Sequence, residues 1–149
     1  MDIKEAANLI ASIATAVGVI FAAIQIWLFR SQAVTTFEDG FAKEYRYLSR
    51  CIPARALLGA ELSEEEKKKH LDEFYHYFDL SNEQAFLRQI GRIRTETWVF
   101  WRDGMHSNFM KPAFNWAWEE FEHTGTTEFS ELRRLRRSGF KEDPKNWKE

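Results

Sequence analysis

Residues 6–29 read AANLIASIATAVGVIFAAIQIWLF and contain no Asp, Glu, Lys or Arg. At about 1.5 Å per residue, a helix over this stretch is roughly 36 Å long, which exceeds the about 30 Å of hydrocarbon in a bilayer. A cleaved signal peptide is the competing interpretation, but its apolar region is shorter and its start is more basic than MDIKE. The sequence therefore predicts an uncleaved transmembrane helix over residues 6–30, preceded by an N-terminal tail of residues 1–5.

The charges on either side of this stretch predict its orientation. The tail holds one lysine against two acids, whereas four cations follow the stretch: Arg30, Lys43, Arg46 and Arg50. The positive-inside rule then places the N-terminus outside and the rest of the chain in the cytoplasm. Two aromatic rings and a snorkelling cation at the cytoplasmic end are typical of a membrane interface, and here they are Trp27, Phe29 and Arg30.

One face of the predicted span carries small side chains at helical spacing, among them Ala11, Ala14, Gly18 and Ala22. Small residues four apart allow two helices to approach each other closely in lipid. This face therefore predicts that the span associates with another span, which belongs either to a second copy or to a partner membrane protein.

The composition limits what the rest of the chain can be. Roughly 115 residues remain, enough for one compact core, and 13 Phe and 6 Trp favour a well-filled core or an adhesive surface. The net charge of −2 gives no field that would attract nucleic acid, so no nucleic-acid partner is expected. The single cysteine, Cys51, excludes an intrachain disulfide and is expected to be a small buried side chain.

The remaining residues show helical periodicity and no strand pattern. Thr35 and Thr36 are expected to cap a helix that begins near Phe37 and ends before Pro53. This predicts an all-α chain: one N-terminal transmembrane helix, a small cytoplasmic helical bundle over residues 31–140, and a polar C-terminal tail over residues 141–149 that docks only through Trp147.

Helix-end signals predict the other helices. Ser63 and Glu66 form a capping box that starts a long helix reaching about Ile90, where Gly91 can take a left-handed conformation. The expected core face of this helix comprises Leu71, Phe74, Phe78, Ala85, Phe86 and Ile90, widened by Tyr75, Tyr77 and Leu80. Further helices are expected to start at Thr95, Pro112 and Thr127, with breaks at Gly125 and Gly139.

Three segments carry a resemblance to known proteins: TTFEDGFAKEYR at residues 35–46, the aromatic-rich stretch from FYHYF to FNWAW at residues 74–118, and ELRRLRRSGFKEDP at residues 131–144. Together the chain resembles a family of small bacterial membrane-anchored helical proteins of unknown function. The resemblance implies the anchored helical architecture and the inner (or intracytoplasmic) membrane of a bacterium. It implies no activity.

The sharpest candidate for chemistry is a metal site. Three pairs place a carboxylate one helical turn before an imidazole: Glu73 and His76, Asp103 and His106, and Glu120 and His123. Di-iron four-helix proteins use such pairs. Two pairs lie near helix ends beside glycines, however, which favours surface histidines, so no metal is predicted.

Three other groups of residues are candidate binding surfaces. A polar cluster lies on the long helix and just after it, and it forms either a ligand groove or a salt-bridged structural network. Its members are Asp79, Asn82, Glu83, Gln84, Arg88, Arg92 and Arg94. A basic amphipathic segment comprises Arg133, Arg134, Arg136 and Arg137. It is expected to form a solvated face, to contact anionic lipid or to bind an acidic partner. Trp116 and Trp118 cannot share a helix face, so one of them is expected to leave the core and to serve as an interface anchor.

The preferred interpretation is a non-enzymatic membrane-tethered interaction module, which is either an accessory subunit of a membrane complex or a homo-oligomer. No catalytic residue and no cofactor is predicted, and the expected partners are membrane lipids and another membrane protein or a second copy. Two alternatives stay open. One is an enzyme with a polar or metal-assisted site that uses Glu73, His76 and Glu83, and the other is a single-span membrane-disrupting effector.

Overall fold

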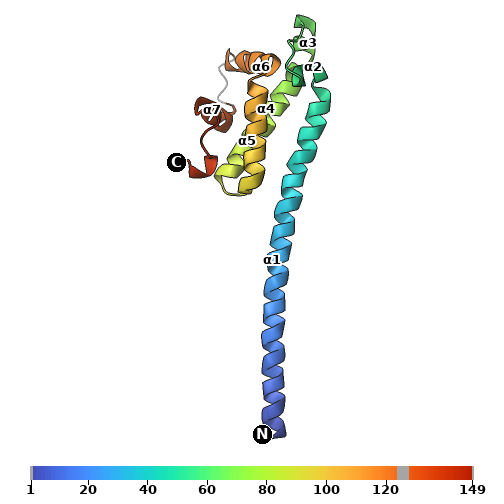
Figure 1. The fold of residues 1–149 in the computed structure, drawn as a ribbon, viewed down its shortest axis with the longest axis vertical. Helices are drawn as coiled ribbons and strands as arrows, with labels where there is room; N and C mark the ends of the chain where they lie inside the picture. The colour runs from blue at the N-terminus through green and yellow to red at the C-terminus, as the bar shows by residue number, and fades with distance from the viewer. Residues whose placement is uncertain (1, 124–127, 149) are drawn as a thin grey trace. The chain divides into compact units, whose positions relative to one another are not determined.

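The computed structural model describes residues 2–123 and 128–148, and within them the chain forms seven α-helices, one 3₁₀ turn and no strand (Figure 1). This confirms the all-α prediction. The chain divides into two compact units, Met1–Phe37 and Glu38–Glu149. The helices are α1 (Ile3–Cys51), α2 (Ala54–Leu57), α3 (Glu64–Lys69), α4 (Leu71–Gln89), α5 (Thr95–Phe109), α6 (Pro112–His123) and α7 (Ser130–Arg137), and the 3₁₀ turn is η1 (Pro144–Asn146).

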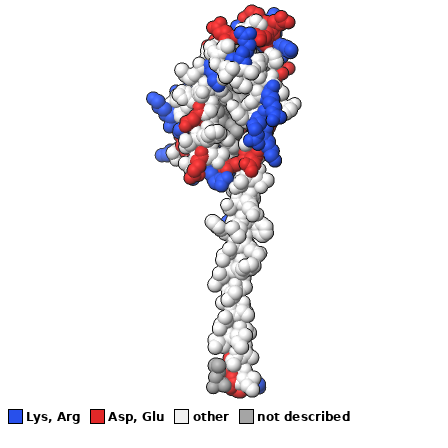
Figure 2. All heavy atoms as spheres, turned by 45° about the vertical axis from the view of Figure 1, so that its right-hand side comes forward, with Lys and Arg blue, Asp and Glu red and all other residues white. Residues whose placement is uncertain are grey.

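The first unit is the N-terminal part of α1, and most of it is an apolar stretch. Within residues 3–29 the large hydrophobic side chains are exposed, from 46% for Leu28 to 85% for Ile3. By length and composition this helix is able to cross a membrane, and none of its most apolar window is buried. Figure 2 shows its surface almost free of charged side chains between the N-terminal end and the second unit. A core helix of a soluble protein would instead have one covered face.

The predicted break between the span and the next helix is wrong. α1 continues without interruption to Cys51, and the boundary between the two units falls inside it. Thr35 does not cap a new helix, because its hydroxyl donates back to the Ser31 carbonyl within α1 at 3.1 Å. Residues 30–36 read RSQAVTT and contain neither Gly nor Pro, so nothing in the backbone ends the helix there.

Several helix ends in the second unit confirm the sequence signals. The Ser63 hydroxyl accepts from the Glu66 amide at 3.3 Å and the Glu66 carboxylate accepts from the Ser63 amide at 2.9 Å, which is the predicted capping box. Gly91 has a φ of +75°, and the Arg92 amide donates to the Leu87 carbonyl at 2.9 Å in a Schellman motif. α1 ends before Pro53, α6 begins at Pro112 and α7 ends before Gly139.

Other predicted helix ends differ from the structure. The long helix is divided into α3 and α4 at His70, where φ is −111°. Three lysines end α3 and two acids begin α4, so each half has the charges that suit its own helix dipole. Thr95 is the first residue of α5 and not its cap. The expected helix start at Thr127 and the break at Gly125 lie outside the described residues.

The core of the second unit is built from aromatic rings of α4, α5, α6 and the segment before α7. Phe78 of α4 is fully buried and contacts the rings of Phe109, Trp118 and Phe129 at centroid distances of 5.3, 5.1 and 6.3 Å. Other buried side chains of this region are Trp98, Met105, Phe109, Phe114, Trp118, Phe129, Leu132 and Leu135. These rings hold the four elements together around one centre.

Two predicted core residues of α4 are exposed. Phe86 is 45% exposed and Ile90 is 48% exposed, whereas Tyr77 and Leu80 are buried. A helix turns about 100° per residue, so a buried stripe through Phe78 directs residues 86 and 90 roughly 100° away from the core. Cys51, expected to be buried, is half-buried.

The C-terminal segment is not a tail that docks only through Trp147. The Asp143 carboxylate pairs with Arg88 of α4, and Pro144 of η1 is fully buried. Trp147 is half-buried, and its indole N–H donates to Glu142 at 2.9 Å. Residues 140–147 are therefore part of the packed unit.

Candidate functional site

Arg88, from the predicted polar cluster, is a structural residue. It is 3% exposed, and its guanidinium donates to both Asp143 oxygens, at 2.8 and 2.5 Å. It also donates to the Ile93 carbonyl at 2.8 Å and to the Thr95 hydroxyl at 3.2 Å. One buried cation thus joins α4, the start of α5 and the C-terminal segment, and four of its five N–H donors are used in doing so.

Two other polar side chains cap helices from a distance. The Asn82 carbonyl accepts from the amides of Glu131 and Leu132 at 3.0 Å each, and so caps α7, whose own N-cap residue Phe129 has no capping side chain. Glu38 of α1 does the same for α5. Its carboxylate accepts from the Arg94 amide at 2.8 Å and from the Arg94 side chain at 2.6 Å.

Glu38 and Asp143 make the stability of the second unit dependent on pH. Burial by itself would raise the pKa of Glu38, but the hydrogen bonds from Arg94 and Thr97 outweigh it and the pKa is lowered from 4.5. The hydrogen bond from Arg88 lowers the pKa of Asp143 from 3.8. In each case the unfolded chain takes up a proton at higher pH than the folded chain does, so folding stability falls as the solution is acidified.

We expect the free energy of unfolding of the second unit to be level above about pH 5 and to fall progressively below pH 4.5. Urea titrations of the full chain at successive pH values, followed by tryptophan fluorescence, measure this. The double variant Glu38→Gln, Asp143→Asn should start less stable and lose less on acidification. An unchanged acid-dependent loss in that variant would contradict the assignment.

Glu83, the remaining candidate acid of the cluster, lies near two other carboxylates. Burial first, and then the charges of Glu44 and Asp79, raise the pKa of Glu83. Within residues 2–123 and 128–148, no hydrogen bond or ion pair joins Glu83 to Glu73 or His76. Glu73 is instead 3.6 Å from the Nδ1 atom of His70.

The three carboxylate–histidine pairs do not converge. Among the described residues, no three His, Cys, Asp or Glu side chains are grouped so that they could hold a metal ion. The His106 ring stacks on Phe140 at 5.2 Å, and the His76 ring packs against Tyr75 at 5.8 Å. The Nδ1 atom of His123 lies 2.5 Å from the Glu119 carbonyl oxygen. Each imidazole thus has a local contact of its own.

Much of the basic segment of α7 is engaged within the chain. Arg133 and Arg136 lie over the Trp118 ring at 5.3 and 5.4 Å, and each approaches the Glu122 carboxylate, at 3.6 and 3.5 Å. Arg134 lies over the Trp147 ring at 4.6 Å. Arg134 and Arg137 are the two exposed members of the set. Arg133 and Arg136, which the sequence suggested as contacts for lipid or a partner, therefore help to pack α7 against α6.

Trp116 and Trp118 separate as expected, although Trp116 is only half-exposed. Trp118 is 1% exposed in the core. The Trp116 ring contacts Phe74 edge-on at 6.5 Å, and the ammonium of Lys67 lies 5.3 Å from its centroid. Trp116 is thus partly covered by its own chain.

The second unit contains a cavity of about 400 Å³ that sequence reasoning missed. It lies between α4, α5 and the part of α1 after Glu38, and aromatic side chains dominate its walls. Gln84, a member of the predicted polar cluster, lines it while being only 5% exposed. Of the polar cluster, this residue alone combines deep burial with a cavity in front of it.

On the first unit, the predicted small-residue face is open. A Cβ atom placed on Gly18 would meet no heavy atom within 4 Å, and Ala11, Ala14 and Ala22 are exposed. At the end of the same segment Trp27 and Phe29 are 68% and 66% exposed, with Arg30 beside them. These residues are free to meet lipid or a second helix.

Comparison of the chain with protein-family models, with curated proteins and with solved structures finds no match. The resemblance to small membrane-anchored helical proteins stays a prediction. The basis for a function is therefore the geometry and chemistry of the chain itself.

Proposed function

We propose that the chain is a non-enzymatic membrane-tethered interaction module, which acts as a homo-oligomer or as an accessory subunit of a membrane complex. Residues 6–30 cross the inner membrane of a bacterium once, with the N-terminus outside and the helical unit in the cytoplasm. The observation that carries this proposal is the long apolar segment of α1, whose large hydrophobic side chains are exposed among the described residues.

The free energy of burying apolar side chains favours an apolar segment that is covered by lipid over one that is exposed to water. Burial of one large apolar side chain is worth about 2 kcal/mol, so leaving the whole segment in water would cost on the order of 20 kcal/mol. Lipid covers such a surface on every side, which suits a helix that is apolar all round. The excess of cations after the segment supports the cytoplasmic placement of the second unit.

Within the membrane, the small-residue face supports helix association. Ala11, Ala14, Gly18 and Ala22 lie within a sector of roughly 80° on an α-helix. Lipid tails are as apolar as the helix, so close packing of two backbones is a main source of association free energy there. Gly18 lies in the middle of this face and, because it has no side chain, allows the closest approach of a second helix.

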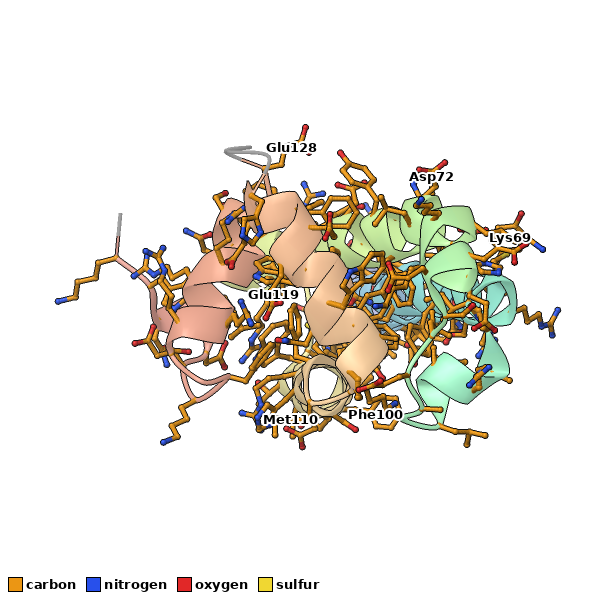
Figure 3. All side chains as sticks on the ribbon, turned by 90° about the horizontal axis from the view of Figure 1, so that it is seen from above. Lys69, Asp72, Phe100, Met110, Glu119 and Glu128 are labelled. Atoms are coloured by element: carbon orange, nitrogen blue, oxygen red, sulfur yellow. The ribbon has the colours of Figure 1, made fainter. Side chains whose placement is uncertain are left out.

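The second unit adds an exposed apolar surface on α5. Phe100 is 78% exposed and Met110 is 76% exposed, and Figure 3 shows both at the same edge of the unit. Val99 is 38% exposed and lies three helical turns from Met110, in the same angular sector. Phe100 lies roughly 80–100° around the helix from these two, and exposed large apolar side chains of this kind favour contact with a partner protein.

The association is tested by crosslinking the full chain in native membranes and identifying the adducts by mass. We expect an adduct with a second copy or with one membrane protein, and we expect Gly18→Leu to reduce it at least tenfold, which corresponds to about 1.4 kcal/mol. The new side chain fits the isolated helix, because the space around Gly18 is open.

Ala16→Leu is the matched control. It adds the same apolar side chain to the same span, but at roughly 160° from Gly18 on the helix. The adduct should persist in this variant. If the parent chain gives no adduct, or if the two variants behave alike, the span is not the association element.

A further inference from the structure

The cavity between α1, α4 and α5 has the size and the walls of a small-molecule site. Its volume of about 400 Å³ falls within the range of roughly 300–1,000 Å³ that is usual for ligand pockets. Four aromatic rings and a methionine from all three helices form the walls: Tyr45, Tyr77, Phe100, Trp101 and Met105. Tyr45 and Phe100 are 39% and 78% exposed, so the cavity opens to solvent.

Three polar side chains of the lining are already bonded within the chain. The Tyr77 hydroxyl accepts from Asn108 at 2.9 Å, and the Ser81 hydroxyl donates to the Tyr77 carbonyl at 2.8 Å. The Asp103 carboxylate accepts from Arg102 at 2.8 Å. These contacts leave the aromatic faces as the main surface that the cavity offers to an occupant.

Four polar groups of the lining have no hydrogen-bond or ion-pair partner among the described residues, and two of them are the Tyr45 hydroxyl and the Trp101 indole N–H. Within residues 2–123 and 128–148, no hydrogen bond or ion pair involves the Gln84 amide or the Arg46 guanidinium. Gln84 as a residue is only 5% exposed and lines the cavity, so water or a ligand there can supply the hydrogen bond that its amide lacks within the chain. Because Asp103 is paired with Arg102, the charge that Arg46 adds to the lining is not neutralised, and it favours an anion.

We propose that this cavity binds a small aromatic carboxylate whose ring carries an N–H or O–H group. The ring packs against Tyr45, Tyr77 and Trp101, the carboxylate pairs with Arg46, and the ring N–H or O–H donates to the Gln84 amide oxygen. This assignment is independent of how the spans associate, because every residue involved belongs to the second unit.

Binding is measured by equilibrium dialysis of the full chain in lipid nanodiscs, with empty nanodiscs as the blank. Indole-3-acetate is the probe that carries all three features. Indole-3-acetamide lacks the charge, tryptamine reverses it, and naphthalene-1-acetate lacks the ring N–H. We expect saturable binding of indole-3-acetate, about tenfold or more tighter than that of the amide and the amine, and weaker binding of the naphthalene compound.

Three variants separate the contributions of the Arg46 charge, the Gln84 hydrogen bond and the cavity volume to binding. Arg46→Gln should weaken indole-3-acetate about tenfold, whereas Arg50→Gln, one turn further along α1 and outside the cavity, should change it less than twofold. Gln84→Leu should remove the preference for the indole over the naphthalene ring. Gly104→Leu fills the cavity, because a Cβ there enters open space, and should abolish binding without lowering the melting temperature.

The outcomes are decisive in both directions. The proposal is overturned if the parent chain binds no probe saturably, if the amide or the amine binds as tightly as the acid, or if Gly104→Leu binds like the parent. Equal losses in Arg46→Gln and Arg50→Gln would also overturn it, because they would reflect only the overall charge of α1.

Discussion

Replacing Phe78 with Ala is expected to lower the free energy of unfolding of the second unit by about 3–5 kcal/mol. Phe78 is fully buried, and its ring contacts rings from α5, from α6 and from the segment before α7. Truncation to a methyl group removes these contacts at once and leaves a cavity that rigid neighbouring rings cannot fill. Urea unfolding of the full chain, followed by tryptophan fluorescence, measures the loss.

Phe86→Ala is the matched control for this experiment. It is the same substitution on the same helix, but Phe86 is 45% exposed. Its expected effect is below about 1 kcal/mol. Similar losses in the two variants would show that the buried face of α4 is not the one described here.

Replacing Arg88 with Met is expected to cost about 3 kcal/mol, because it leaves the Asp143 carboxylate without its partner in a partly buried position. The Ile93 carbonyl and the Thr95 hydroxyl lose their donors as well. Methionine keeps the length and much of the volume of the side chain, so the effect reports lost hydrogen bonds and charge pairing.

The Arg88→Met variant should also release the C-terminal segment. We expect residues 141–148 to be cut by protease faster than in the parent chain, as mapped by mass spectrometry. Arg92→Met, on an exposed residue four positions later, serves as the control and should leave both stability and cleavage unchanged. Unchanged cleavage in Arg88→Met would mean that Asp143 does not hold the segment in place.

Local signals in the sequence predicted the features that depend on a few neighbouring residues. The capping box at Ser63, the left-handed Gly91 and the start of α6 at Pro112 each depend on contacts within one helical turn. The apolar segment was equally predictable, because its length and its lack of charge are properties of the sequence itself. The absence of a helix end between residues 30 and 36 was misread, since two threonines are compatible both with a cap and with a continuing helix.

Features that depend on distant residues were not predictable in the same way. Glu38 caps a helix that begins more than fifty positions later, and Asn82 caps α7, which begins at Ser130. The buried face of α4 follows from which side chains α5 and α6 present to it, so Phe86 and Ile90 were wrongly predicted to lie in the core. The cavity is the space left between three helices, and no pattern along one of them encodes it.

The transmembrane placement of residues 6–29 is tested most directly by extracting membranes that contain the full chain with alkaline carbonate. The expected result is that the chain stays in the lipid pellet, whereas a variant with Val17 and Ile20 both replaced by Arg, each costing about 3 kcal/mol at the centre of a span, is released. Recovery of the unmodified chain in the aqueous supernatant would contradict the span and the membrane-tethered function that depends on it.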